Sequence, residues 1–172
     1  MIEFILYTAN KIATGNYYAL CLLYRDEEPE EGWPPAVVLY PTAHKLQVLK
    51  EIECGRLDDD HRYYLWAPDE VREHIDSREG FPPDLVPNPL AFDERARKFL
   101  ASFLDSGGSR AVELASVALA RELEGHADDF TFAKSDPFVV FATDNTERDA
   151  IDDLTTCASD AVLKKLQVAG LL

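Results

Sequence analysis

Apolar positions in this chain fall into short continuous runs and into stripes with helical spacing. The clearest run is Phe138–Thr143, which is rich in β-branched and aromatic residues and lies between Pro137 and the turn residues Asp144-Asn145. A run without alternating polar positions is typical of a strand buried on both faces, and such a strand needs a layer of structure on each side. The sequence therefore predicts that Phe138–Thr143 is the central strand of the fold.

Three other segments have the composition of strands. Tyr17–Tyr24 is apolar on both alternating faces, which indicates an inner strand, and Ala36–Tyr40 follows it after a polar connection that contains Trp33-Pro34-Pro35. We expect these two segments to form an antiparallel pair with an enlarged loop. His61–Trp66 is predicted to be a third short strand, and Phe130–Phe132 stays open as an extra one. The predicted sheet thus has about four or five strands.

The remaining apolar residues follow a helical period. Thr42 is predicted to cap a helix that ends near Gly55. Its inward residues are predicted to be Leu46, Leu49 and Ile52. The helix that starts at residues 108–109 is apolar almost all round, which indicates burial between other elements. Helices are predicted at residues 2–13, 42–55, 69–75, 92–103, 108–123 and 146–169, the last of them either continuous or broken near Thr155-Thr156.

A proline-rich segment, Gly80–Pro89, is predicted to cross between a strand-rich front half and a helix-rich back half. The chain has 172 residues, which suits one domain with a sizeable core. The fold class expected from the sequence is therefore α+β, as a single domain 1–172 with a mostly antiparallel sheet covered by helices.

Charge is the strongest compositional feature. The chain has 32 acidic residues and only 17 Lys and Arg, which gives a formal net charge of −15. A field of this sign repels nucleic acids and anionic membranes and attracts cationic partners. The competing interpretation is that the acids only keep the protein soluble. No apolar run is long enough for a membrane span, and Glu3 stands where a signal peptide carries bases, so we expect a cytoplasmic protein.

Catalytic motifs are not found in the sequence, and we predict no cofactor and no catalytic residue. The cysteines Cys21, Cys54 and Cys157 are far apart and form no CxxC pair, which argues against a disulfide framework or a zinc site. Cys21 lies in an apolar run and is expected to be a buried small hydrophobe. The neighbours of Cys157 include Asp153, whose charge is expected to raise the thiol pKa rather than activate the thiol.

One alternative is a carboxylate site at the end of the Phe138–Thr143 strand. Asp144, Asp149 and Asp153 carry oxygen ligands of the kind that Mg²⁺ or Ca²⁺ prefers. The competing interpretation assigns Asp144 to a turn and Asp149 to the dipole of the last helix. On this alternative the protein is an enzyme, with or without a divalent ion.

Acidic residues also stand beside aromatic residues in two segments. Protein interfaces commonly combine these residue types, with a charged rim around aromatic anchors. The candidate interface residues are Glu27, Glu28, Glu30, Glu31, Trp33, Asp58, Asp59, Asp60, Tyr63 and Trp66. The competing interpretation is that both acidic segments are solvated and that the tryptophan beside the first lies in the core.

Three segments resemble an uncharacterised bacterial domain family of unknown function: Tyr18–Tyr24, Leu65–Glu70 and Phe138–Asp144. The chain has Val71 where that family's pattern places an aromatic residue. Some such small acidic domains resemble immunity proteins, which neutralise polymorphic toxins by direct binding. The resemblance thus implies an immunity-type protein and brings no catalytic residues.

The leading hypothesis is a non-catalytic cytoplasmic protein that binds a partner protein of basic charge, as an immunity-type antidote does. A third hypothesis is that the acidic surface mimics DNA and competes with duplex DNA for a basic protein.

Overall fold

The computed structural model describes residues 1–24, 33–71, 98–103, 110–144 and 150–172. In chain order the elements are α1 (Ile2–Ile12), β1 (Asn16–Leu23), β2 (Ala36–Pro41), α3 (Thr42–Glu53), the 3-10 helix η1 (Asp59–Leu65), α6 (Ala111–Gly125), the 3-10 helix η4 (Ala127–Asp129), β3 (Ala133–Thr143), α7 (Ala150–Cys157) and α8 (Asp160–Val168). Residues 68–71 and 98–103 are also helical. The α+β class predicted from the sequence is confirmed.

The sheet has three strands within the described residues, in the order β2-β1-β3. The β1–β2 pair is antiparallel, with Leu23 opposite Ala36, as predicted. The β1–β3 pair is parallel, with Leu23 opposite Thr143. The prediction of a mostly antiparallel sheet of four or five strands is therefore wrong for this part of the chain, because His61–Trp66 and Phe130–Phe132 are not strands.

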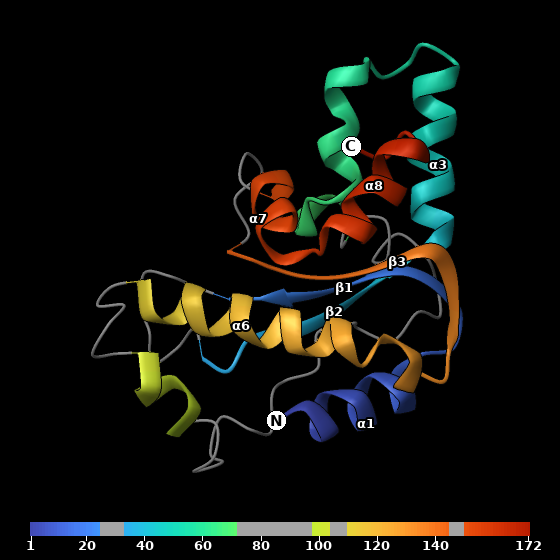
Figure 1. The fold of residues 1–172 in the computed structure, drawn as a ribbon. Helices are drawn as coiled ribbons and strands as arrows, with labels where there is room; N and C mark the ends of the chain where they lie inside the picture. The colour runs from blue at the N-terminus through green and yellow to red at the C-terminus, as the bar shows by residue number, and fades with distance from the viewer. Residues whose placement is uncertain (25–32, 72–97, 104–109, 145–149) are drawn as a thin grey trace.

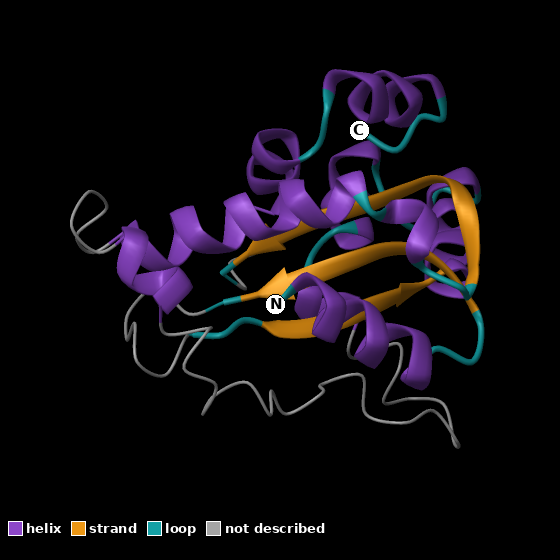
Figure 2. Cartoon of the chain, turned by 60° about the horizontal axis from the view of Figure 1, so that its bottom comes forward, coloured by secondary structure: helices purple, strands orange, loops and turns teal. Residues whose placement is uncertain are grey.

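Helices cover both faces of this sheet. Figure 1 shows α1 and α6 on one face and α3, α7 and α8 on the other, and Figure 2 shows the strands between them from another side. The carboxyl half of β3 is fully covered, with Phe141, Ala142 and Thr143 each 0% exposed. Burial of this strand on both faces is confirmed, but β1 rather than β3 lies in the middle of the sheet.

The outer edge of β3 is covered by contacts that run between the two helical layers. The Arg121 guanidinium on α6 donates to the carbonyl of Thr156 on α7 (2.7 Å). The Glu124 carboxylate accepts the hydroxyl of Ser159, the residue before α8, at 2.7 Å. The thiol of Cys157 accepts the Ala142 backbone N–H at 3.4 Å. An end strand can therefore be as buried as an inner one.

The segment His61–Trp66 is part of η1 and the residue after it, so its prediction as a strand is wrong. Side chains from the core hold three successive carbonyls at its end. Tyr18 donates its hydroxyl to the Leu65 carbonyl. The Tyr40 hydroxyl donates to Trp66 (3.1 Å), and the His44 Nε2–H to Tyr64 (2.9 Å). The end of a helix leaves its last carbonyls without intrahelical partners, so these bonds stabilise the helical conformation.

The helix α3 begins and ends close to the predicted positions, and Leu49 and Ile52 pack against the core as predicted. Gly55 follows it with φ of +68°, the left-handed conformation that favours glycine after a helix. Its buried residues are His44 and Val48, whereas Leu46 is 61% exposed. Thr42 does not cap the helix, because its hydroxyl lies 2.7 Å from the Ser135 hydroxyl.

The last part of the chain forms two helices, α7 and α8, which answers the question left open by the sequence. The break lies at Ala158-Ser159 rather than near Thr155-Thr156. The predicted crossing loop at Gly80–Pro89 lies outside the described residues.

Candidate functional site

The two tryptophans of the candidate interface lie in the core. Trp33 is 7% exposed and stacks on Phe99 with ring centroids 5.7 Å apart. Trp66 is 0% exposed and donates its Nε1–H to the Leu171 carbonyl at 2.9 Å. The burial of Trp33 is what the competing interpretation of the acidic segments expects, and Trp66 is buried as well.

Two other candidate residues of the second acidic segment, Asp58 and Tyr63, have described side chains. Asp58 is exposed and directly precedes η1. Tyr63 is partly buried, and its ring packs against Tyr64 (4.4 Å between centroids) and His61 (6.2 Å). Asp59 and Asp60 form the first residues of η1, and their side chains lie outside the description.

The described residues of the two candidate segments lie apart. Trp33 precedes the end of β2 that pairs with Leu23, at the carboxyl end of β1. The segment η1 is held by Tyr18, near the amino end of β1. An eight-residue strand is roughly 25 Å long, so Trp33 and η1 lie toward opposite ends of the sheet. The acidic residues Glu27, Glu28, Glu30 and Glu31 of the first segment lie outside the described residues.

The carboxyl ends of β1 and β3 lie side by side, which the sequence did not predict. The Tyr24 N–H donates to the Thr143 carbonyl at 3.0 Å just beyond the paired strands. Asp144 follows at once, partly exposed. On the sequence, the acid-rich segment 26–31 begins two residues after Tyr24. Tyr24 and Asp144, which are distant in sequence, therefore follow neighbouring strand ends.

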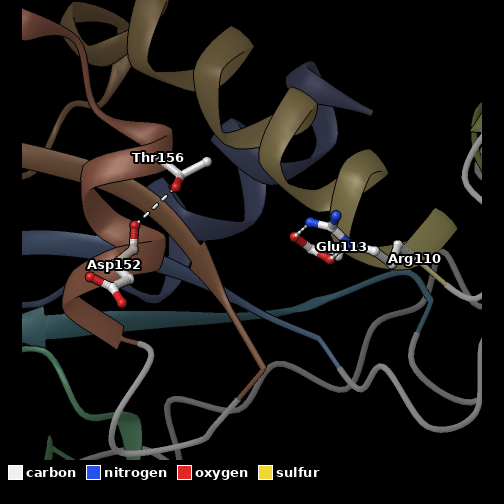
Figure 3. A network of polar contacts seen from close by, with 4 residues as sticks. All are labelled: Arg110, Glu113, Asp152 and Thr156. Carbon is white, nitrogen blue, oxygen red and sulfur yellow. Dashed lines mark hydrogen bonds and ion pairs between the residues drawn. The ribbon is translucent and has the colours of Figure 1, made fainter.

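The first turn of α7 adds two more carboxylates, Asp152 and Asp153. The carbonyl of Asp152 accepts the Thr156 hydroxyl at 3.0 Å, while the Asp152 carboxylate points away from Thr156, as Figure 3 shows. Asp152 is exposed and Asp153 is partly buried. The acid in the first turn of α6, Glu113, is bound by Arg110, also drawn in Figure 3.

We refer to Asp144, Asp152, Asp153 and the strand ends at Tyr24 and Thr143 as the carboxyl-end surface. Sequence analysis singled out Asp144 and Asp153 as candidate metal ligands, and the parallel β1–β3 pair places Asp144 beside β1. Asp149, the third candidate ligand, lies outside the described residues. Among the described residues, no group of three His, Cys, Asp or Glu side chains could hold a metal ion.

Two buried thiols, Cys157 and Cys21, lie within the influence of the Asp153 charge, and burial disfavours their thiolate forms. Burial raises the pKa of the Cys157 thiol to about 11, and the charge of Asp153 adds to the effect. Burial likewise raises the pKa of the Cys21 thiol far above its usual value, in part offset by a hydrogen bond with Tyr40. Both thiols are protonated at neutral pH, and Cys21 is 0% exposed, as the apolar run around it predicts.

This burial predicts how the three cysteines react with a thiol reagent. At pH 8, about one part in a thousand of Cys157 is thiolate, because that pH is three units below a pKa of about 11. Cys54 is exposed. Ellman's reagent is therefore expected to modify one thiol rapidly in the folded protein and three after denaturation. Cys54→Ser should remove the rapid phase, and a rapid phase that persists would show that a buried thiol is reactive.

Comparisons with protein-family models, curated proteins and solved structures found no match to this chain. Within the described residues, none of the helices is both long and apolar enough to cross a membrane. The resemblance to a bacterial family with immunity-type members stays a prediction.

Proposed function

We propose that the protein is a non-catalytic binding protein that neutralises a basic toxin or effector in the cytoplasm, as an immunity-type antidote does. The carrying observation is the parallel β1–β3 pair, which joins the strand end at Tyr24 to Asp144 and the acids of α7. Carboxylates gathered on one surface raise the local concentration of a cationic partner and speed its approach.

The surroundings of the carboxyl-end surface fit binding better than catalysis. Its neighbouring thiols are protonated and buried, as derived above. The helices on both sides of β3 are fixed to each other through Arg121 and Glu124. A surface held this firmly loses little conformational entropy when a partner binds, which favours affinity.

Charge reversal at Asp152 tests this proposal. The probe is the protein encoded by the open reading frame next to this protein's gene, provided that it is basic. Asp152→Lys is expected to weaken its binding about five-fold, on the order of 1 kcal/mol, and to flatten the dependence of Kd on salt. Calorimetry at 50, 100 and 200 mM NaCl would measure both effects.

The matched control is Asp128→Lys, which makes the same change at an exposed position in η4, before the opposite end of β3. It should leave Kd unchanged. Equal weakening by both variants would mean that only net charge matters, and no weakening by either would remove the carboxyl-end surface from the interface. Heat on titration with millimolar Mg²⁺, Ca²⁺ or Mn²⁺ would instead favour the carboxylate-site enzyme.

A further inference from the structure

Lys45 lies in the first turn of α3 and is partly buried, although lysine side chains are usually solvated. Its Nζ lies 5.5 Å from the centroid of the Tyr18 ring, and Tyr18 is only 1% exposed. Among the residues that the structure describes, no carboxylate forms an ion pair with this amine. The ammonium form of Lys45 has therefore lost part of its hydration without gaining an opposite charge.

The helix end around Lys45 also disfavours a positive charge. The first turn of α3 contains no acidic residue, and no side chain caps it. The positive end of the helix dipole, which acts mainly within the first turn, is therefore not offset by an acid of that turn. Burial lowers the pKa of the Lys45 ammonium and so acts in the same direction. Both effects increase the share of neutral amine at this position.

The Tyr18 ring compensates only part of these effects. The face of an aromatic ring attracts an ammonium, but 5.5 Å is close to the outer limit of about 6 Å for this contact. Lys50, on the same helix, has the opposite setting. It is exposed, it lies in the last turn, where the dipole favours a cation, and its charge acts on Glu51. Lys45 is thus distinguished from Lys50 by burial, by helix position and by the lack of an acid.

We propose that Lys45 is a carbamate site, at which the neutral amine takes up carbon dioxide. The lone pair of Nζ attacks the carbon of CO2, an N–C bond forms as one C–O π pair moves onto oxygen, and the nitrogen releases a proton to water. CO2 is uncharged, so the net charge of −15 does not repel it. The product is an anion at the positive end of α3, where the dipole stabilises negative charge. Because Lys45 is only partly buried, water reaches the carbamate oxygens.

Carbamate formation reverses the charge beside Tyr18. The ammonium over the ring is replaced by an anion, and the hydroxyl of the same tyrosine holds the Leu65 carbonyl at the end of η1. The modification thus acts on the contacts between β1, α3 and η1. It is independent of the proposed function, because Lys45 is not part of the carboxyl-end surface.

Trapping of the carbamate tests this proposal. The full chain is equilibrated with isotopically labelled bicarbonate and CO2 at pH 8 and treated with triethyloxonium ion, which ethylates carbamates. Peptide mass spectrometry then separates Lys45 from the α-amino group of Met1 and from the other lysines. We expect at least about three-fold more label at Lys45 than at Lys50, since burial and the helix dipole both favour the neutral amine at Lys45. Equal labelling of the two lysines, or none at Lys45, would overturn the proposal.

Ala43→Glu tests the contribution of the helix end, because it adds an acid to the first turn of α3. Labelling at Lys45 should fall about two-fold or more, since the new carboxylate favours the ammonium and repels the carbamate. The matched control is Ala43→Gln, which adds a side chain of the same size without charge and should leave labelling at Lys45 unchanged. Labelling at Lys50 should stay the same in both variants. A ratio of Lys45 to Lys50 labelling that Ala43→Glu does not lower would also contradict the proposal.

Discussion

Replacement of Trp66 by alanine is expected to lower the free energy of unfolding by about 3–5 kcal/mol, the usual loss for a large buried aromatic residue. The ring is 0% exposed and meets Tyr18 and Phe141 edge to face, with centroids 5.6 and 5.9 Å apart. Its Nε1–H also holds the Leu171 carbonyl. A loss of this size is a large part of the 5–15 kcal/mol that stabilises most domains.

Urea unfolding followed by far-ultraviolet circular dichroism would measure this loss. This signal does not depend on tryptophan fluorescence, which the substitution itself changes. Trp66→Phe separates packing from hydrogen bonding, and it should cost about 1–3 kcal/mol because the Leu171 carbonyl then lacks its donor. Leu46→Ala, at a side chain that is 61% exposed, should stay within about 0.5 kcal/mol. A loss below 1 kcal/mol for Trp66→Ala would mean that the contacts of this ring are not those of the folded core.

Removal of the Tyr18 and Tyr40 hydroxyls is expected to destabilise η1. Tyr18→Phe and Tyr40→Phe leave the carbonyls of Leu65 and Trp66 without their donors, at a cost of about 1–3 kcal/mol each. Both hydroxyls stay protonated far above neutral pH, because burial raises the pKa of each tyrosine well above its usual value. Hydrogen exchange of the amides in η1 should accelerate before exchange in β1 does.

The two substitutions are also expected to be coupled, since the rings of Tyr18 and Tyr40 lie 5.8 Å apart and bond successive carbonyls. Their combined effect should differ from the sum of the single effects by 0.5 kcal/mol or more. Tyr7→Phe is the control, because Tyr7 is 63% exposed on α1 and should be neutral. Strict additivity would show that the two hydroxyls hold η1 independently.

The pattern of apolar residues along the chain correctly predicted the three strands of the described sheet. Tyr17–Tyr24 and Ala36–Tyr40 are strands because they are apolar on both faces, and both are almost entirely buried. Phe138–Thr143 has the same pattern, but the pattern reports only burial. It cannot tell an inner strand from an end strand whose edge is covered by helices, as β3 is by α6 and α7.

Contacts between residues distant in sequence determine the two features of the fold that the sequence pattern did not predict. His61–Trp66 has strand-like residues, yet it is helical because Tyr18, Tyr40 and His44 reach it from other elements. The parallel pairing of β1 with β3 joins segments separated by most of the chain. The carboxyl-end surface depends on that pairing, which the sequence did not predict. Of its acids, the sequence analysis singled out Asp144 and Asp153 as candidate metal ligands and did not place them beside the end of β1.

The covered edge of β3 also bears on self-association. A strand at the end of a sheet offers a row of backbone donors and acceptors to any other chain that can pair with it, which is the usual route to aggregation and domain swapping. Here Cys157 occupies the N–H of Ala142, and α6 and α7 are joined around the strand. Damage to α7 would therefore turn the apolar carboxyl half of β3 into a template for other copies of the chain.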